Sequence, residues 1–197
     1  HGLTDSPYLF HDLAAYYHKS GITVRTLLLP GHGTAPEALK YVDYKDWQQA
    51  TAFAITKTLQ DFDQVYLGGF STGGALILDN LLSSSQSLEK LKGVMLWAPA
   101  SKAKSNIAWA ARIVDWLPFY DYADKGADID FAKYESFPLN AGAQVHALMN
   151  ELTSKLNKKD TIPDIPLLTV TSQVDTTINT QTTIELLTTW HNDKSRQ

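Results

Sequence analysis

The sequence predicts an α/β fold in which a mostly parallel sheet is flanked by helices. Apolar runs with the length of buried strands alternate with amphipathic stretches of helical periodicity, which is the pattern of βαβ units. With 197 residues and 44% hydrophobic content, the chain is long enough for one substantial core. A long aromatic interval interrupts the alternation before the last apolar run. We therefore expect one globular body with one insertion.

The predicted strands are short apolar runs rich in β-branched or aromatic side chains, at Thr23–Leu29, Gln64–Gly68, Gly93–Ala98 and Pro166–Thr171. The predicted helices are the stretches of helical character around them, at Pro7–Ser20, Tyr44–Gln60, Thr72–Ser83 and Thr180–Trp190. Each crossover is long enough to return the chain to the same edge of the sheet. We expect these crossovers to be right-handed.

The interval 99–163 is predicted to be a helical cap inserted into a core made of residues 1–98 and 164–197. Apolar residues recur at helical spacing over Ile107–Leu117. The interval is rich in aromatic side chains, namely Trp109, Trp116, Phe119, Tyr120, Tyr122, Phe131, Tyr134 and Phe137. We interpret it as a lid whose apolar underside covers a substrate groove above the strand ends. The alternative is that these aromatic side chains only hold the insertion onto the sheet.

Composition excludes several classes of function. The net charge of -4, with acidic and basic residues interspersed, leaves no basic surface for nucleic acid and no polybasic membrane anchor. The absence of cysteine excludes disulfides, thiolate metal sites and a cysteine nucleophile. No apolar stretch approaches the roughly 20 residues that span a bilayer, so stable membrane insertion is not expected. The compartment cannot be read from the sequence: a cytoplasmic location is favoured, but the chain starts at His1 without an initiator Met, so a signal peptide would be invisible.

Ser71 is the leading candidate for a nucleophile. It lies in the pattern G-x-S-x-G, between a predicted strand and a predicted helix, with Gly69 and Gly73 on either side. In such a tight, strained turn the two glycines remove side chains that would collide with the strand and helix, and the hydroxyl projects clear of the sheet. The N-terminus of the following helix offers free N–H groups and the positive end of its dipole to a developing oxyanion. The alternative is a serine in an ordinary glycine-rich loop.

Four segments together resemble the α/β-hydrolase superfamily, and within it the branch of monoacylglycerol lipases, bacterial carboxylesterases and serine aminopeptidase-like hydrolases. They are His1-Gly-Leu-Thr-Asp-Ser-Pro7, Leu29-Pro-Gly-His-Gly33, Gly69-Phe-Ser-Thr-Gly73 and Val174-Asp-Thr-Thr-Ile178. Their order and spacing fit the family across nearly the whole chain. The resemblance implies the α/β-hydrolase fold and an oxyanion hole made by the backbone N–H groups of Leu3 and Thr72. It also implies that His32 orders its loop rather than acting as a catalyst.

Asp175 matches the catalytic acid of the family. It follows the predicted strand Pro166–Thr171, at the sheet edge where ligands gather in open α/β sheets. Its task would be to accept the N–H of a histidine, fix the tautomer and stabilise the imidazolium. The alternative is a solvated aspartate that opens a turn before Thr176 and Thr177.

The resemblance implies a catalytic histidine beyond Gln197, because the family places it after one more helix and one more strand. His191 is the single histidine after Asp175, but it directly follows the predicted helix Thr180–Trp190. That helix should run antiparallel to the strands and carry His191 to the end of the sheet opposite Ser71.

The family also places a central strand directly before His1, between the strands that correspond to Thr23–Leu29 and Gln64–Gly68. Without it, these two neighbours cannot pair, and their backbone groups lack partners. Flanking strands of the fold are therefore absent from these 197 residues, which we expect to be an internal part of a longer hydrolase or to lack flanking segments that were not recorded.

The sequence thus predicts a serine hydrolase that cleaves carboxylic esters through an acyl-enzyme on Ser71. No cofactor or metal is expected, and the expected partner is a small-molecule acyl ester, with a medium-chain ester or monoglyceride favoured. The alternatives are a thioesterase, an aminopeptidase-like or C–C hydrolase on the same fold, and a non-catalytic relative that binds a ligand or protein partner. The sequence does not predict the oligomeric state.

Overall fold

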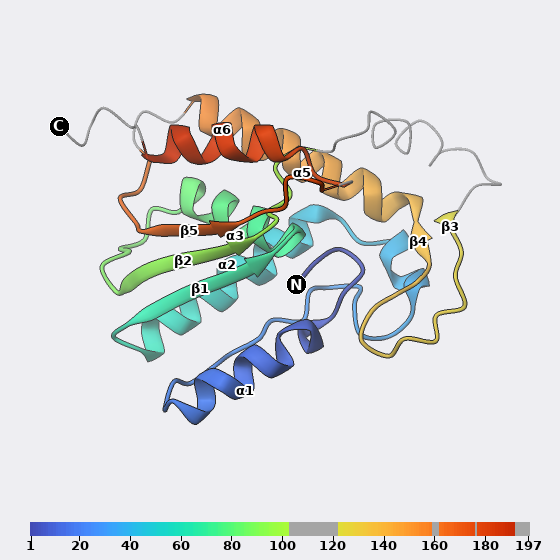
Figure 1. Ribbon diagram of the computed structural model, residues 1–197, viewed down its shortest axis with the longest axis horizontal. Helices are drawn as coiled ribbons and strands as arrows, with labels where there is room; N and C mark the ends of the chain where they lie inside the picture. The colour runs from blue at the N-terminus through green and yellow to red at the C-terminus, as the bar shows by residue number, and fades with distance from the viewer. Residues whose placement is uncertain (103–121, 159–161, 176, 192–197) are drawn as a thin grey trace.

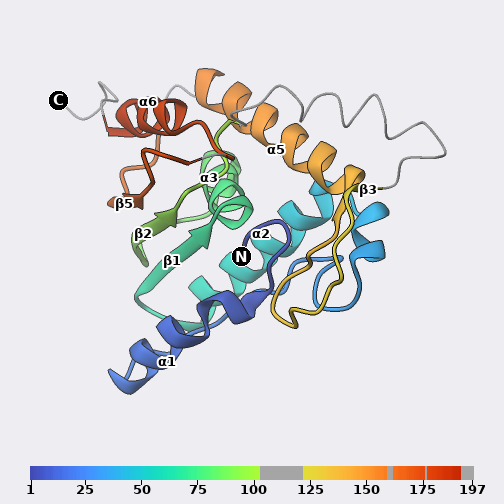
Figure 2. The ribbon, with the colours of Figure 1, turned by 45° about the vertical axis from the view of Figure 1, so that its right-hand side comes forward.

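The computed structural model describes residues 1–102, 122–158, 162–175 and 177–191 (Figure 1). The predicted helix Ile107–Leu117 lies outside the described residues, as do Trp109, Trp116, Phe119 and Tyr120. In the part that is described, a central sheet has helices α2 and α3 against one face, and Figure 2 shows the same arrangement from a second side.

The central sheet has three parallel strands in the order β1–β2–β5: β1 is Val65–Phe70, β2 is Leu91–Trp97 and β5 is Leu167–Val170. Three of the predicted strands are thereby confirmed, with small shifts at their ends. In the register of the sheet Phe70 pairs with Trp97, which in turn pairs with Val170. The three strands therefore end together, and the loops that follow β1 and β5 emerge at the same edge of the sheet.

The predicted strand Thr23–Leu29 is wrong, because this segment forms no strand. Within the described residues β1 pairs with β2 alone, and no strand lies between β1 and Thr23–Leu29. A strand exists only through hydrogen bonds to a neighbour, so an apolar run without a neighbour stays outside the sheet.

In the described residues the four predicted helices are confirmed, and two further helices, η2 and α5, are present. In chain order the helices are η1 (Pro7–Phe10) and α1 (His11–Lys19), the short 3-10 helix η2 (Pro36–Lys40), α2 (Tyr44–Asp61), α3 (Thr72–Ser83), α5 (Leu139–Lys158) and α6 (Thr180–His191). Helix α2 begins with a capping box in which Asp43 accepts from the first turn and Asp46 accepts from the Asp43 N–H. No helix in the described ranges is long and apolar enough to cross a bilayer.

The interval 99–163 contains a long helix and a small antiparallel pair of strands. The pair consists of β3 (Tyr122–Asp124) and β4 (Phe137–Pro138). Helix α5 packs against α3 and α2, and it buries apolar side chains such as Leu148 and Leu152 in the main core. The described part of this interval therefore helps to build the core. The division into a core and a cap stays a prediction.

Helix α3 is the centre of the core. Most of its residues are buried, and the fully buried Leu76, Leu78 and Leu81 pack in one cluster with Leu96 of β2 and Leu148 of α5. Burying a leucine side chain contributes about 2 kcal/mol relative to leaving it exposed. The start of α3, which follows β1 directly, is therefore held in a fixed place relative to the sheet edge.

Helix α3 also buries a carboxylate. Asp79 is 3% exposed and accepts hydrogen bonds from Lys155 of α5 and Gln48 of α2, both at 2.7 Å. A buried charge of this kind is tolerated because it is paired. The three helices are thus joined by polar contacts as well as by apolar packing.

Candidate active site

Ser71 lies in the turn between β1 and α3, in a backbone conformation that strains any residue with a β-carbon. Its φ is 49° and its ψ is -112°. Such a conformation costs about 1–3 kcal/mol and persists only where the surroundings enforce it. The Ser71 N–H donates to Trp97 O at 2.9 Å, and the Ser71 carbonyl accepts from Ala75 N at 3.1 Å and Ala100 N at 3.0 Å. The end of β2 and the loop after it therefore fix the turn.

Two glycines allow the close approaches around this turn. A β-carbon on Gly69 would lie 2.7 Å from the backbone of Gly73 and Gly74, so Gly69 lets β1 pass directly under the first turn of α3. A β-carbon on Gly73 would lie 2.9 Å from the backbone of His1. The missing side chain of Gly73 therefore allows the N-terminal segment, and not the sheet, to approach closely. The Gly73 N–H donates to His1 O at 3.0 Å.

The N–H groups of Leu3 and Thr72 are free donors near this turn. Thr72 is the first residue of α3, so its N–H has no acceptor within the helix. The Gly2 carbonyl contacts His1 Nδ1 at 2.9 Å and accepts from Asp5 N at 3.3 Å. Because the peptide is trans, the Leu3 N–H lies in the plane of the Gly2–Leu3 peptide and points in the direction opposite to Gly2 O. Among the described residues, no acceptor is seen for either N–H.

Two buried histidines surround the Leu3 peptide. His1 Nε2 accepts the Leu29 N–H at 3.1 Å, which places the proton of this ring on Nδ1, facing Gly2 O. His32 Nε2 lies 2.7 Å from Leu3 O, while its Nδ1 faces the carbonyls of Leu29 and Pro30. Burial lowers the pKa of His32 from its ordinary value, although these carbonyls act in the opposite direction. The role of His1 escaped the sequence analysis, because its partner lies 28 residues away.

Asp175 lies in the loop after β5, at the same edge of the sheet as Ser71. Its Oδ1 accepts the N–H groups of Thr177 and Ile178, each at 2.8 Å, and its own N–H donates to Ser172 O at 3.3 Å. The carboxylate therefore orders a local turn, as the alternative interpretation expects. Its position at the carboxyl end of a parallel strand also suits the catalytic acid. Thr176 lies outside the described residues.

Helix α6 carries His191 away from Ser71. It begins at Thr180, beyond the Asp175 loop, and Figure 1 shows it running back toward the end of the sheet where the strands start. The backbone of His191 therefore lies at the opposite end of the sheet from Ser71. The structure thus places Ser71 and Thr72 at the start of α3, which is hydrogen-bonded to the N-terminal segment, and places His32 against Leu3 of that segment. It sets Asp175 at the same edge of the sheet as Ser71 and leaves His191 apart.

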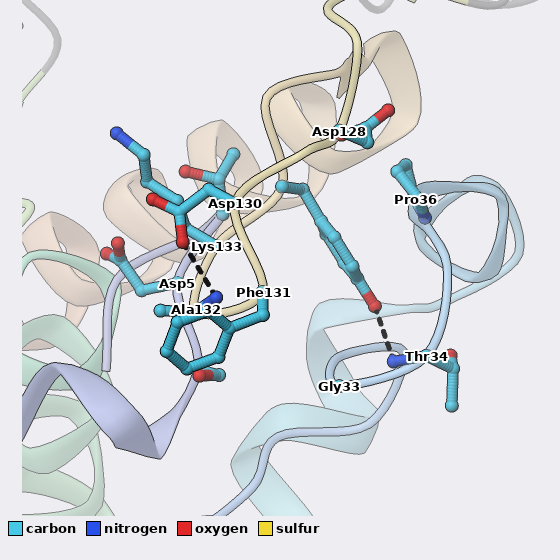
Figure 3. Close-up of a pocket in the computed structure, with 12 residues that line it drawn as sticks. Asp5, Gly33, Thr34, Pro36, Asp128, Asp130, Phe131, Ala132 and Lys133 are labelled. Carbon is cyan, nitrogen blue, oxygen red and sulfur yellow. Dashed lines mark hydrogen bonds between the residues drawn. The ribbon is translucent and has the colours of Figure 1, made fainter. Parts of the chain in front are cut away.

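A pocket of about 180 Å³ lies beside the N-terminal segment, between the loops at Thr4–Ser6, Gly33–Pro36 and Asp128–Tyr134 (Figure 3). Burial raises the pKa of Asp5, with smaller opposing effects from nearby positive charges that include Lys133. The Asp128 carboxylate accepts from Glu135 N and Ser136 N and is thereby occupied within its own loop. Ser71 does not line this pocket. In the described ranges no group of three or more metal-binding side chains gathers.

The chain belongs to the α/β-hydrolase family, because the sequence profile described as "Alpha/beta hydrolase family" matches residues 1–182. It is similar to a thermostable monoacylglycerol lipase from Bacillus sp. (strain H-257), with 27% identity over 164 residues. The match covers 80% of this chain and 63% of that lipase. The chain therefore spans less than two thirds of the length of this relative.

Solved structures show the same fold. A structure from work on LipS and LipT, two metagenome-derived lipolytic enzymes, has a TM-score of 0.75 and 24% identity, covering 95% of this chain and 75% of that one. The monoacylglycerol lipase of Paleococcus ferrophilus has a TM-score of 0.71 and 17% identity, covering 96% of this chain and 77% of that one. The fold class predicted from the sequence and the family resemblance are both confirmed.

Proposed function

We propose that this chain carries the catalytic serine of a hydrolase that cleaves carboxylic esters. Ser71 is the nucleophile, Leu3 and Thr72 supply the oxyanion hole, and Asp175 is the acid of the triad. The observation that carries the proposal is the strained Ser71 at the sheet edge, where α3 is hydrogen-bonded to the segment that contains Leu3. The similarity to a protein named as a monoacylglycerol lipase supports an ester as substrate.

In the proposed reaction the Ser71 hydroxyl attacks the carbonyl carbon of the ester, and its proton passes to a histidine imidazole. The N–H groups of Leu3 and Thr72 stabilise the negative charge that develops on the carbonyl oxygen. Collapse of this intermediate expels the alcohol, which takes the proton from the imidazolium, and leaves an acyl group on Ser71. Water activated by the same histidine then releases the carboxylic acid. These steps require no metal or organic cofactor.

The histidine of this reaction is proposed to lie beyond Gln197. His1 and His32 are engaged by backbone groups around the Leu3 peptide, and α6 takes His191 to the far end of the sheet. The proposed acid, Asp175, is at the correct edge to receive an imidazole from a later strand. The interval 99–163 is proposed to include the cap over the acyl chain, which favours a medium-chain ester or monoglyceride.

Labelling with a fluorophosphonate tests this proposal, because the probe phosphonylates a serine only where a base and an oxyanion hole activate it. The intact protein that contains this chain should be labelled, and Ser71→Ala should lose the label and esterase activity together. Ser85→Ala is the matched control, since Ser85 is exposed beyond the end of α3, and this variant should be labelled at the wild-type rate.

Thermal unfolding of the three proteins establishes that each is folded. Labelling that persists in folded Ser71→Ala contradicts the assignment of the nucleophile. A folded intact protein that resists labelling and cleaves no ester favours a non-catalytic relative that binds a ligand or protein.

A further inference from the structure

His32 is a buried imidazole surrounded by hydrogen-bond acceptors. Its side chain is 3% exposed, and its two ring nitrogens face three backbone carbonyls. Nε2 lies 2.7 Å from Leu3 O, whereas Nδ1 lies 3.2 Å from Leu29 O and 3.1 Å from Pro30 O. Carbonyl oxygens cannot donate, so His32 can stabilise this arrangement only as a donor.

The shortest of these contacts indicates where the proton lies. Burial lowers the pKa of His32, so near neutral pH the ring is uncharged and carries one N–H. The contact to Leu3 O is shorter than either contact of Nδ1, which is shared between two carbonyls. We therefore place the proton on Nε2, where it forms a hydrogen bond with the Leu3 carbonyl.

The neighbours of His32 hold its ring in this orientation. Tyr134 stacks on it with 10° between the ring planes, and the His1 ring meets it edge-on at 4.7 Å between centroids. The Tyr134 hydroxyl donates to Gly31 O and accepts from Thr34 N, so it closes the loop around His32. The imidazole therefore has little freedom to follow Leu3 if that segment moves.

The Leu3 N–H lies between two fixed carbonyls. On one side Gly2 O is held by the His1 ring and by Asp5 N, and on the other side Leu3 O is held by His32. Rotation of the segment about Leu3 would break at least one of these contacts. The direction of the Leu3 N–H therefore depends on His32, which does not touch the N–H itself.

We propose that His32 is a positioning residue for the oxyanion hole: its Nε2–H fixes the Leu3 carbonyl and thereby aims the Leu3 N–H at the developing oxyanion. This inference rests on the ester-hydrolase function proposed above. Because the oxyanion exists only in the transition state, loss of the contact lowers kcat and leaves KM almost unchanged.

A pair of amide variants separates the two sides of the ring. In His32→Gln the side-chain amide nitrogen reaches the place of Nε2, whereas in His32→Asn it reaches the place of Nδ1, so only the glutamine keeps a donor for Leu3 O. We expect kcat for ester hydrolysis to fall roughly 10- to 100-fold in His32→Asn and only about 3-fold in His32→Gln. The loss in His32→Asn is smaller than the loss of kcat on removing an oxyanion-hole donor outright, because the Leu3 N–H is misdirected and not removed. KM should change less than about 2-fold in both.

Tyr134→Phe is the matched control for loop order. It removes the hydrogen bonds to Gly31 O and Thr34 N but keeps the ring that stacks on His32 and leaves the Leu3 contact in place. We expect its kcat to stay within about 3-fold of the wild type. Unfolding temperatures measured for all variants separate loss of fold from loss of positioning.

Equal losses of kcat in His32→Gln and His32→Asn, or a loss in Tyr134→Phe as large as in His32→Asn, would overturn the proposal. Nitrogen-15 NMR of the intact wild-type protein gives an answer even if the variants do not fold. A proton on His32 Nε2 that exchanges slowly with water supports the assignment, and an unprotonated Nε2 at neutral pH contradicts it. If the wild-type protein hydrolyses esters but these tests fail, only the proposed role of His32 is disproved. If the wild-type protein is inactive and is not labelled, the proposed function itself is disproved.

Discussion

Ser71 occupies a backbone conformation that residues with a β-carbon rarely adopt, and three backbone hydrogen bonds hold it there. Its neighbour Gly69 makes the turn possible by letting β1 touch α3. The strained conformation of Ser71 and the lack of a side chain at Gly69 have the same cause. The chain can turn this sharply from β1 into α3 only if no β-carbon at Gly69 keeps the strand and the helix apart. The G-x-S-x-G pattern thus predicts the close contact between β1 and α3 as well as the tight turn between them.

Gly69→Ala tests this contact. The new β-carbon would lie 2.7 Å from the Gly73 and Gly74 backbone, which cannot move aside as a side chain would, so α3 must shift. We expect a loss of about 1–3 kcal/mol in the free energy of unfolding, measured by urea denaturation, together with slower fluorophosphonate labelling of Ser71.

Gly93→Ala is the control for this prediction. Gly93 also lies in a strand of the sheet, but its added β-carbon would meet the exposed ring of Tyr66 at 3.3 Å, which can turn away. If the two variants lose the same stability and label at the same rate, the close approach at Gly69 has no special role.

Some of the residues around Ser71 could be predicted from the sequence, and others could not. Ser71, Leu3 and Thr72 could be proposed as site residues because each follows from a local pattern or from the family resemblance. The contacts of His1 with Leu29 and of His32 with Leu3 could not be proposed, because they join side chains to backbone groups 28 and 29 residues away. No local pattern encodes such contacts.

Helices α2, α3 and α5 are joined by a polar network on their shared faces. Glu151 of α5 accepts from Lys45, Tyr44 and Gln48 of α2, and also pairs with Lys155. Burial alone would raise the pKa of Glu151, but these hydrogen bonds outweigh it and lower the pKa from 4.5 to about 2. The charged form of Glu151 is therefore stabilised by folding.

The network predicts a loss of stability in acid. A carboxyl whose pKa is lower in the folded state contributes stability that is complete above its ordinary pKa and disappears as the pH falls through the folded value. For Glu151 this window runs from 4.5 down to about 2. We expect wild type to be more stable than Glu151→Gln at neutral pH, and the difference to shrink across that window.

Urea denaturation at several pH values measures this difference. Other carboxyls, such as Asp61 with its lowered pKa, also lose stability in acid, so the comparison with Glu151→Gln isolates the one group. A difference between the two proteins that stays constant with pH would contradict the assignment to Glu151.

Apolar periodicity located most elements but not all of them. The helix α3 and three strands were predicted because their patterns are strong and continuous. Thr23–Leu29 was wrongly predicted as a strand, because the pattern records apolar character and not the presence of a neighbour. Helix α5 was not distinguished within the interval 99–163, although Val145, Leu148 and Leu152 recur at helical spacing.

The molecule as a whole presents Ser71 and Asp175 at one edge of the sheet, and we propose that the interval 99–163 contains a cap over this edge. An apolar cap over this edge would bind the acyl chain of an ester, and longer chains would bury more apolar surface. The described part of the interval already contributes α5 to the core, so the cap would be anchored on the hydrolase fold itself.

Activity on p-nitrophenyl esters of graded chain length tests this arrangement. We expect kcat/KM of the intact protein to rise from acetate to a medium-chain ester by roughly 10-fold or more, since each buried CH₂ contributes about 0.8 kcal/mol. Ser71→Ala should remove the activity at every length. Rates that fall steadily from acetate onward would argue against a medium-chain acyl substrate.

The hydrogen bond from Gly73 N to His1 O has a consequence for the energetics of the proposed reaction. It fastens the start of α3 to the N-terminal segment, so the two proposed oxyanion-hole donors, Leu3 and Thr72, lie on segments that are hydrogen-bonded to each other. A site assembled in this way is preorganised: its dipoles need not rotate when charge appears, and the reorganisation energy that water would demand is largely avoided.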